Sequence, residues 1–578
     1  MRKGQSASSS PRRWLALPLA LVAALLSLAA GGATTALASG TRQSPLVVRT
    51  DTGAVRGMLT ADAREFLGIP YAAPPTGALR WRPPRPAARW RGVRDATRPT
   101  SVCAQTGSIS TGVPATSTAE DCLYLNVYTP RAADVRRLPV MVWIHGGGFT
   151  GGAGSIYDGA VLAARGDVIV VTINYRLGPF GFLAIPSLDR ESPAGSSGDY
   201  GLMDQQAALR WVRRNAVAFG GDRRDVTIFG ESAGGASVCE NMTSPTASGL
   251  FTRAIAESGC LLPTPARQAA EQHGTAFAAS LGCADAATAA GCLRGKPAGD
   301  VLTAASGAFA GWAPVVGGRT LPSQPATAFA TGRYDHVPLL QGTNHDEGRF
   351  FVALGFDALG APMTAAQYPA VVAAEFGASA AGQILAEYPL SGYPSPDLAF
   401  ASVLTDGVFS CPALLADNLV SGSGVYGYEF SDPNAPNDFG ISFSFPLGAA
   451  HSTELQYVFQ RIPVTDVAPP FTPAQLALSD QIIGYWTRFA ATGNPNGPGA
   501  PSWPAFTPPG QQLQELTPAG TAPPQSAFAT DHQCAFWAHT AVTSSSLTSP
   551  AGCFKIAAYP AVMEGATRRS GDFCHGVG

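Results

Sequence analysis

The sequence predicts an α/β fold with a large, mostly parallel central sheet flanked by helices. Three observations favour it. The chain has 578 residues, of which 46% are hydrophobic, so it can bury a large core. Short apolar, β-rich runs recur and alternate with helical stretches, as in folds built from parallel strands and crossover helices. No linker, charge block or repeat of about 20 to 50 residues divides the middle of the chain, so we expect one large domain there.

Six apolar runs are predicted to be strands. They cover residues 140–144, 168–173, 226–229, 254–256, 337–340 and 425–430. Near-continuous apolar runs are typical of strands that are buried on both faces, as in parallel sheets.

Two helices can be placed from their patterns. Residues 204–219 carry Ala208, Trp211, Val212 and Ala216 at helical spacing. Residues 474–491 follow Thr472, a suitable cap, and Pro473, which favours the first turn of a helix.

The N-terminus has the three regions of a secretory signal peptide. Four basic residues come first: Arg2, Lys3, Arg12 and Arg13. An apolar run at 14–30 and the small-residue site Ala36-Leu37-Ala38 follow, so we expect cleavage after Ala38 and a secreted protein. The alternative is a membrane anchor, but this run contains Pro18 and falls short of the roughly 20 residues that a span needs. The Arg12-Arg13 pair permits twin-arginine export, which leaves the Sec and twin-arginine routes undecided.

The predicted mature chain has no basic excess. Removing four positive charges from a formal net charge of −2 leaves −6. We therefore expect no nucleic-acid partner, since nucleic-acid binding depends on clustered positive charge.

We expect the chain to divide into a signal peptide at 1–38, a main domain at 39–540 and an extension at 541–578. The extension is rich in Ser, Thr, Ala and Gly, and it carries Cys553 and Cys574. We expect it to be tied by a disulfide.

Ten cysteines in an exported chain predict disulfides. Cys103 and Cys122, like Cys283 and Cys292, are near enough in sequence to close small loops. No spacing forms a CxxC pair suited to zinc, so we expect no metal and no cofactor. Spacing alone leaves the remaining pairs open.

A candidate nucleophile lies in the run Gly230-Glu231-Ser232-Ala233-Gly234. The run follows the strand at 226–229 and precedes a segment of small residues, which is the context of a nucleophile elbow in an α/β-hydrolase fold. A serine on such a strained turn needs glycine two residues away on either side, because side chains there would collide with the adjacent strand and helix. Ser232 is therefore the predicted nucleophile.

A second glycine-rich run, His145-Gly146-Gly147-Gly148-Phe149, follows the strand at 140–144. Consecutive glycines allow backbone N–H groups to approach an anionic oxygen. We expect the amides of Gly147, Gly148 and Ala233 to form an oxyanion hole.

The base and the acid should follow the serine in the order acid, then histidine. This order excludes His145 as the base. His345 lies in a polar turn after the strand at 337–340, where the acid is expected, and there Asp346 and Glu347 compete. His451 is the preferred base, and the alternatives His532 and His539 lie near the end of the main domain.

These motifs resemble those of the type-B carboxylesterases, a family that includes cholinesterases, bile-salt-type and fungal lipases and bacterial esterases. The similarity is carried by the runs at 66–72, 120–130, 219–222, 226–234 and 534–537, and it extends over about residues 45–540. It implies an α/β-hydrolase fold in which Ser232 is the nucleophile, His451 the general base and Glu347, rather than Asp346, the acid that orients it. It also implies oxyanion donors at Gly147, Gly148 and Ala233.

The resemblance further implies disulfides between Cys103 and Cys122, Cys283 and Cys292, and Cys411 and Cys534. Elimination then leaves two pairs, Cys239 with Cys260 and Cys553 with Cys574.

The sequence departs from its relatives in ways that bear on substrate. The loop at 104–121 contains no aromatic residue, whereas cholinesterases place a tryptophan there for the choline cation. The same loop is too polar for the amphipathic lid of an interfacial lipase, so a soluble ester is favoured. Ser452 stands where relatives often have glycine.

We therefore expect a secreted carboxylic ester hydrolase that acts on a small-molecule ester through a Ser-His-Glu triad and an acyl-enzyme intermediate. One alternative is a triacylglycerol lipase. Another is a non-catalytic recognition module, since some members of the superfamily keep the fold and lose the nucleophile. A third is an amidase or peptidase on the same fold.

Overall fold

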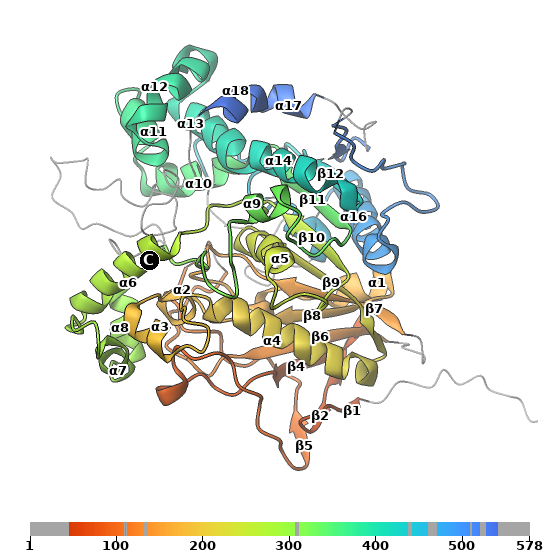
Figure 1. Ribbon diagram of the computed structural model, residues 1–578. Helices are drawn as coiled ribbons and strands as arrows, with labels where there is room; N and C mark the ends of the chain where they lie inside the picture. The colour runs from red at the N-terminus through yellow and green to blue at the C-terminus, as the bar shows by residue number, and fades with distance from the viewer. Residues whose placement is uncertain are drawn as a thin grey trace, which may run out of the picture. The chain divides into compact units, whose positions relative to one another are not determined.

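A ten-stranded sheet with parallel central strands organises the protein (Figure 1). Across the sheet the order is β13 (Gln514–Leu516), β12 (Val425–Phe430), β11 (Leu339–Asn344), β10 (Arg253–Glu257), β9 (Gly221–Glu231), β7 (Leu138–Ile144), β8 (Ile169–Ile173), β6 (Tyr124–Pro130), β4 (Ala63–Pro70) and β3 (Met58–Leu59). Neighbouring strands from β13 to β8 are parallel, and those from β8 to β3 are antiparallel. The predicted α/β fold with a mostly parallel sheet is confirmed.

The computed structural model describes residues 46–540 except 109, 111, 132–136, 307–310, 437–441, 461–470, 509–510 and 521–526. The described residues fall within one compact unit. The expected signal peptide and the C-terminal extension with Cys553 and Cys574 lie outside the described residues.

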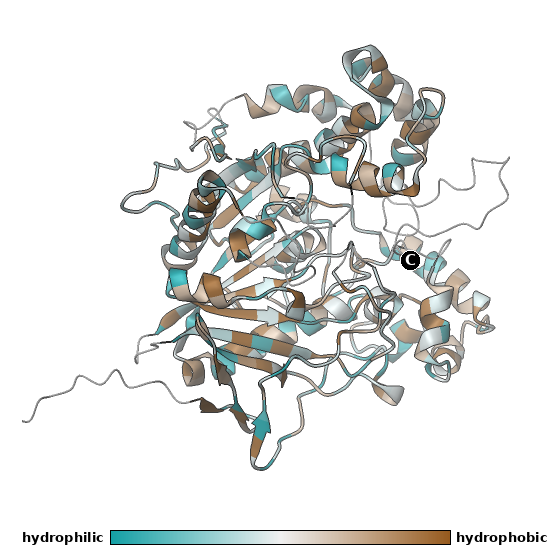
Figure 2. Cartoon of the chain, turned by 180° about the vertical axis from the view of Figure 1, so that it is seen from behind, coloured by the Kyte–Doolittle hydropathy of each residue, from teal (hydrophilic) through white to brown (hydrophobic). Residues whose placement is uncertain are grey.

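Strand β7 shows why the central strands have near-continuous apolar sequences. Val140, Val142 and Ile144 belong to one hydrophobic core, and Met141 and Trp143 belong to a second core. Successive side chains of a strand point to opposite faces, so both faces of the sheet are buried. Hydrophobic colouring accordingly marks the central strands in Figure 2.

Helices cover both faces. On the face of the first core lie α4 (Tyr200–Asn215) and α5 (Ala233–Thr243), and on the face of the second lie α1 (Ala160–Gly166) and α16 (Pro473–Thr492). A capping box between Thr472 and Gln475 starts helix α16, and Gly493, whose φ is +77°, caps its C-terminal end.

A third hydrophobic core is formed by helices that follow β11 (Figure 1). They are α10 (Glu347–Gly355), α11 (Tyr368–Phe376), α12 (Ala378–Glu387) and α13 (Pro396–Leu404). A π-helical segment, Thr405–Ser410, joins α13 to α14 (Cys411–Val420). In the described chain, the helical stretch Pro396–Ser423 has the length and mean hydropathy, 1.6, to cross a membrane, but 78% of its apolar window is buried within the protein, as in an ordinary core helix.

The remaining elements are shorter or peripheral. The helices are α2 (Gly178–Phe182), α3 (Pro186–Glu191), α6 (Arg267–Ser280), α7 (Ala289–Arg294), α8 (Ala298–Ala304), α9 (Pro325–Ala330), α15 (Leu455–Phe459), α17 (Phe528–Asp531) and α18 (Cys534–His539). A small sheet contains β1 (Val47–Arg49), β2 (Ala54–Arg56) and β5 (Val93–Asp95). The antiparallel strands at the N-terminal side of the fold were not among those predicted.

The described chain contains four disulfides, of which three close short loops and one joins distant segments. The pairs are Cys103 with Cys122, Cys239 with Cys260, Cys283 with Cys292, and Cys411 with Cys534. The last pair ties α18 to the start of α14, across 123 residues of sequence.

Candidate active site

Ser232 lies on a sharp turn between β9 and α5. Its φ of +57° and ψ of −123° fall in a region that non-glycine residues rarely adopt. Its backbone N–H donates to the carbonyl of Glu257 on β10 at 2.9 Å, and its carbonyl accepts from the N–H of Ala236 at 2.8 Å. The neighbouring strand and the helix thus hold the strained conformation.

Two glycines make this turn possible. A Cβ on Gly230 would lie 2.5 Å from the carbonyl oxygen of Ile144, and a Cβ on Gly234 would lie 2.0 Å from the same atom. Real Cβ atoms do not approach backbone so closely, so the turn packs against β7 only with glycine at both positions.

The glycine run after β7 reaches the same turn. A Cβ on Gly146 would lie 3.1 Å from the Cβ of Ser232 and 2.8 Å from the carbonyl oxygen of Glu231. Gly147 and Gly148 have φ values of +98° and +59°, which suit glycine. Ala233, the third predicted donor, is the first residue of α5.

His451 and Glu347 lie in direct contact. The Nδ1 of His451 is 2.6 Å from Oε2 of Glu347, and both side chains are buried. The other carboxylate oxygen of Glu347 accepts the N–H of Asn344 at 2.8 Å. The acid is therefore fixed by the end of β11.

The alternative acid, Asp346, has different partners. It forms an ion pair with Arg349 at 2.8 Å and accepts the N–H of Ala449 at 3.1 Å. Among the contacts of the described residues, only Glu347 of these two acids touches His451.

Glu231, whose contact with the base the sequence did not predict, touches the other nitrogen of His451. Its Oε1 lies 3.0 Å from Nε2 of His451 and accepts a hydrogen bond from the hydroxyl of Ser452 at 2.7 Å. The signal was its place beside Ser232, although sequence alone does not bring it to His451. Ser452 has a φ of +68°, where glycine would be unstrained, and this contact gives its hydroxyl a partner.

Burial and neighbouring charges shift the pKa values of His451 and Glu231 in opposite directions. Burial works to lower the pKa of His451, but the carboxylates of Glu231 and Glu347 outweigh it, so the pKa lies above its ordinary value. Burial raises the pKa of Glu231, while His451 and Ser452 act to lower it.

Aromatic rings enclose the imidazole. The ring centroids of Phe351 and Phe409 each lie 5.0 Å from that of His451, and the centroid of Phe350 lies at 5.7 Å. This apolar surround strengthens the electrostatic interactions of His451 with its two carboxylates.

The other candidate histidines lie elsewhere. His145 is fully buried, stacks on Tyr175 and has its pKa lowered by burial to about 4. His345 and His532 both contact Glu429. Partners at Asp406 and Glu429 outweigh burial and raise the pKa of His532 to about 10.

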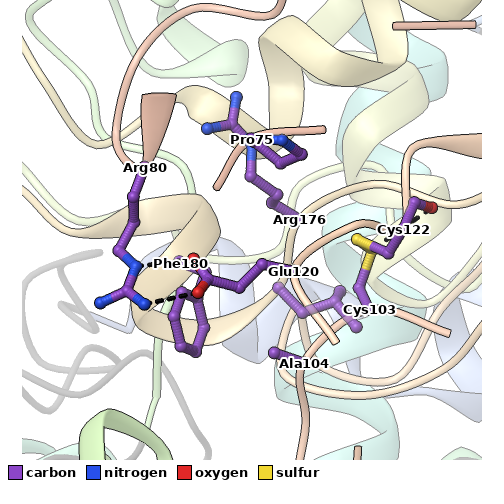
Figure 3. A pocket seen from close by; sticks show the side chains of 9 residues that line it. Pro75, Arg80, Cys103, Ala104, Glu120, Cys122, Arg176 and Phe180 are labelled. Carbon is purple, nitrogen blue, oxygen red and sulfur yellow. Dashed lines mark hydrogen bonds and ion pairs between the residues drawn. A yellow bond between two sulfur atoms is a disulfide. The ribbon is translucent and has the colours of Figure 1, made fainter. Parts of the chain in front are cut away.

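A small cavity lies beside the disulfide between Cys103 and Cys122 (Figure 3). Its lining also includes Arg176, Arg80 and Glu120, and the last two form a bidentate ion pair. The predicted catalytic side chains do not line this cavity, so it is distinct from the site around His451.

A model of the carboxylesterase family matches residues 44–537. The chain belongs to the carboxylesterase family. As expected for this family, it is a carboxylic ester hydrolase with an α/β-hydrolase fold.

Individual carboxylesterases resemble it over most of their length. The para-nitrobenzyl esterase of Bacillus subtilis is 38% identical over 80% of this chain and 92% of its own. The fumonisin B1 esterase of Sphingopyxis macrogoltabida is 34% identical over 87% and 93%. A solved structure of a thermophilic PNB esterase has a TM-score of 0.73 and 35% identity, covering 85% of this chain and 100% of that one.

Proposed function

We propose that this carboxylesterase is secreted and hydrolyses small, soluble esters through an acyl-enzyme on Ser232. The observation that carries the proposal is the contact of His451 with Glu347 at 2.6 Å, while Nε2 of the same imidazole faces Glu231, the residue before Ser232. A histidine that an acid orients can take the proton of a serine within its reach, and the contact with Glu231 places His451 beside the nucleophile elbow.

In the first step, Ser232 attacks the ester carbonyl as Nε2 of His451 takes its proton, and the alcohol leaves with that proton. In the second step, His451 takes a proton from water as the water attacks the acyl-enzyme, and it returns this proton to the Ser232 oxygen as the acid leaves. Glu347 holds Nδ1 of His451 and stabilises the imidazolium. Glu231 supplies a second carboxylate. Its Oε1 lies 3.0 Å from Nε2, the atom that carries the transferred proton.

We propose that the amides of Gly147, Gly148 and Ala233 stabilise the oxyanion of both steps. The contact of Gly146 with the turn at Ser232 supports this, because it brings the glycine run beside the nucleophile. Loss of one such donor typically lowers the rate about 100- to 1000-fold.

The proposed substrates are small esters. The loop at 104–121 has no aromatic residue for a choline cation and little apolar surface for a lipid interface. Relatives named para-nitrobenzyl esterase, cocaine esterase and fumonisin B1 esterase point in the same direction.

Secretion is supported by two features. The four disulfides suit an oxidising compartment, and the sequence of residues 1–38 has the pattern of a signal peptide.

The test is a rate profile for p-nitrophenyl esters from acetate to palmitate, measured for dissolved and emulsified substrate. We expect kcat/KM to be highest for dissolved short esters and to show no jump when an emulsion forms. A jump with long-chain substrate would identify a lipase instead. A recognition module would hydrolyse none of the series, and an amidase would cleave the matching anilides as fast as the esters.

A further inference from the structure

Three side chains outside the proposed active site bring a nitrogen or carboxylate oxygen close together. They are His345, directly after β11, Glu429 on β12, and His532, between α17 and α18. One nitrogen or carboxylate oxygen from each lies within 4.8 Å of the others. The Nδ1 of His345 is 2.9 Å and the Nε2 of His532 is 2.7 Å from the same oxygen, Oε1 of Glu429.

The donor set and spacing suit zinc. Two imidazole nitrogens and a carboxylate oxygen are ordinary zinc ligands, with bonds of about 2.0 to 2.2 Å. Such bonds place the ligand atoms of a tetrahedral site about 3.3 Å apart. The nitrogens of His345 and His532 lie 2.9 and 2.7 Å from Oε1 of Glu429, about half an ångström closer than that spacing.

A second carboxylate supports one of the histidines from behind. The Nδ1 of His532 lies 2.7 Å from Oδ1 of Asp406. The other oxygen of Asp406 accepts the hydroxyl hydrogen of Tyr388 at 2.8 Å, and the Tyr388 oxygen accepts from the indole N–H of Trp537 at 2.7 Å. A carboxylate that orients a ligating histidine in this way is the usual outer partner of a zinc site.

The cluster is open on one side and has the charge that a divalent cation needs. The side chain of His345 is 48% exposed, whereas that of His532 is 4% exposed. With neutral imidazoles, Glu429 and Asp406 give the group two negative charges, which one divalent ion balances. Without a metal, protons between the imidazoles and carboxylates serve the same purpose.

We propose that His345, Glu429 and His532 bind one divalent transition-metal ion of the zinc type, with water at the open position. The ion would join the ends of β11 and β12 to the segment around α17 and α18, which packs against the π-helical segment and α14 (Figure 1). The disulfide between Cys411 and Cys534 fastens the same segment. The metal would therefore stabilise the fold, and it takes no part in the proposed catalytic mechanism.

The test uses the full-length mature protein without a histidine tag, after dialysis against a chelator. Calorimetric titration with Zn²⁺ should give one site per chain, and changing the ionisation enthalpy of the buffer should reveal proton release, because the metal displaces protons. Co²⁺ should give the visible absorption bands of tetrahedral coordination. His345→Ala should weaken Zn²⁺ binding by at least about tenfold. His345 is half-exposed, so this variant should fold.

Two controls separate the site from adventitious binding. His539→Ala removes an exposed histidine from the same end of the chain and should leave the titration unchanged. Zn²⁺ should raise the Tm of the wild type and of His539→Ala, but not that of His345→Ala or Glu429→Gln. The proposal is overturned if the wild type shows no saturable binding, or if His345→Ala and Glu429→Gln bind Zn²⁺ as tightly as the wild type. Either result would leave the cluster as a network of ion pairs alone.

Discussion

The Nε2 of His451 lies 3.0 Å from Oε1 of Glu231, so the imidazole contacts a carboxylate on each of its two nitrogens. A base must be neutral to accept a proton from serine. The charges of Glu231 and Glu347 overcome burial and raise the pKa of His451, so we expect the acid limb of kcat/KM to lie above the ordinary histidine pKa of about 6.5.

Glu231→Gln should move that acid limb to lower pH. The substitution removes a negative charge beside Nε2, so the pKa of His451 falls and the base is neutral in more acidic solution. Glu257→Gln is the matched control, since Glu257 is also buried but hydrogen-bonds Trp486 instead. If wild type and Glu231→Gln had the same pH profile, Glu231 would not raise the pKa of the catalytic base, and the prediction would be wrong.

Glu347→Gln and Asp346→Asn should separate the two adjacent acids. Replacing the acid that orients the base lowers kcat by about 10,000-fold in a serine protease, and we expect a loss of about 1000- to 10,000-fold for Glu347→Gln. Asp346→Asn should retain most of its activity, because Asp346 pairs with Arg349 and the Ala449 N–H. Steady-state kinetics on p-nitrophenyl acetate gives kcat for both variants. A larger loss for Asp346→Asn than for Glu347→Gln would make Asp346 the acid.

Ser452→Ala should be less stable than Ser452→Gly by about 1 kcal/mol. Both variants lose the hydrogen bond to Glu231, but only alanine keeps the strain of a φ of +68°. Denaturant unfolding of both variants measures the difference. Equal stabilities would show that the left-handed backbone at 452 carries no such cost.

Gly234→Ala should unfold or inactivate the protein, whereas Gly291→Ala should not. A Cβ at 234 would lie 2.0 Å from the Ile144 carbonyl oxygen, while a Cβ at 291, in α7, would meet nothing within 4 Å. Alanine inside an open helical position stabilises by about 0.5–1 kcal/mol. Soluble yield and thermal melting compare the two, and a well-folded, active Gly234→Ala would contradict the packing argument.

The sequence predicted the parallel strands except β13, because these strands are buried on both faces, whereas β13 is a short strand at the edge of the sheet. The runs at 140–144 and 425–430 match β7 and β12 within two residues. Strands β4 and β6 have mixed sequences and were not predicted. They pair with each other in antiparallel fashion at one side of the sheet. Their strand conformation is set by this pairing and not by a continuous apolar run.

The sequence predicted the local parts of the site but not the contacts between residues that are distant in sequence. The turn at Ser232 and the glycine run are local, so spacing and backbone requirements identify them. The choice of Glu347 over Asp346 came from family resemblance, and the contact of Glu231 with His451 joins residues 220 positions apart. The cluster of His345, Glu429 and His532 likewise forms only when β11, β12 and the C-terminal helices meet.

The central claim is that Ser232 is the nucleophile, and mass spectrometry after treatment with a fluorophosphonate tests it most directly. We predict one added phosphonyl group per chain, mapped to the peptide that contains Ser232, with parallel loss of ester hydrolysis. Ser232→Ala should remain unlabelled and inactive while melting like the wild type. Labelling at another residue, or hydrolysis retained by Ser232→Ala, would contradict the mechanism.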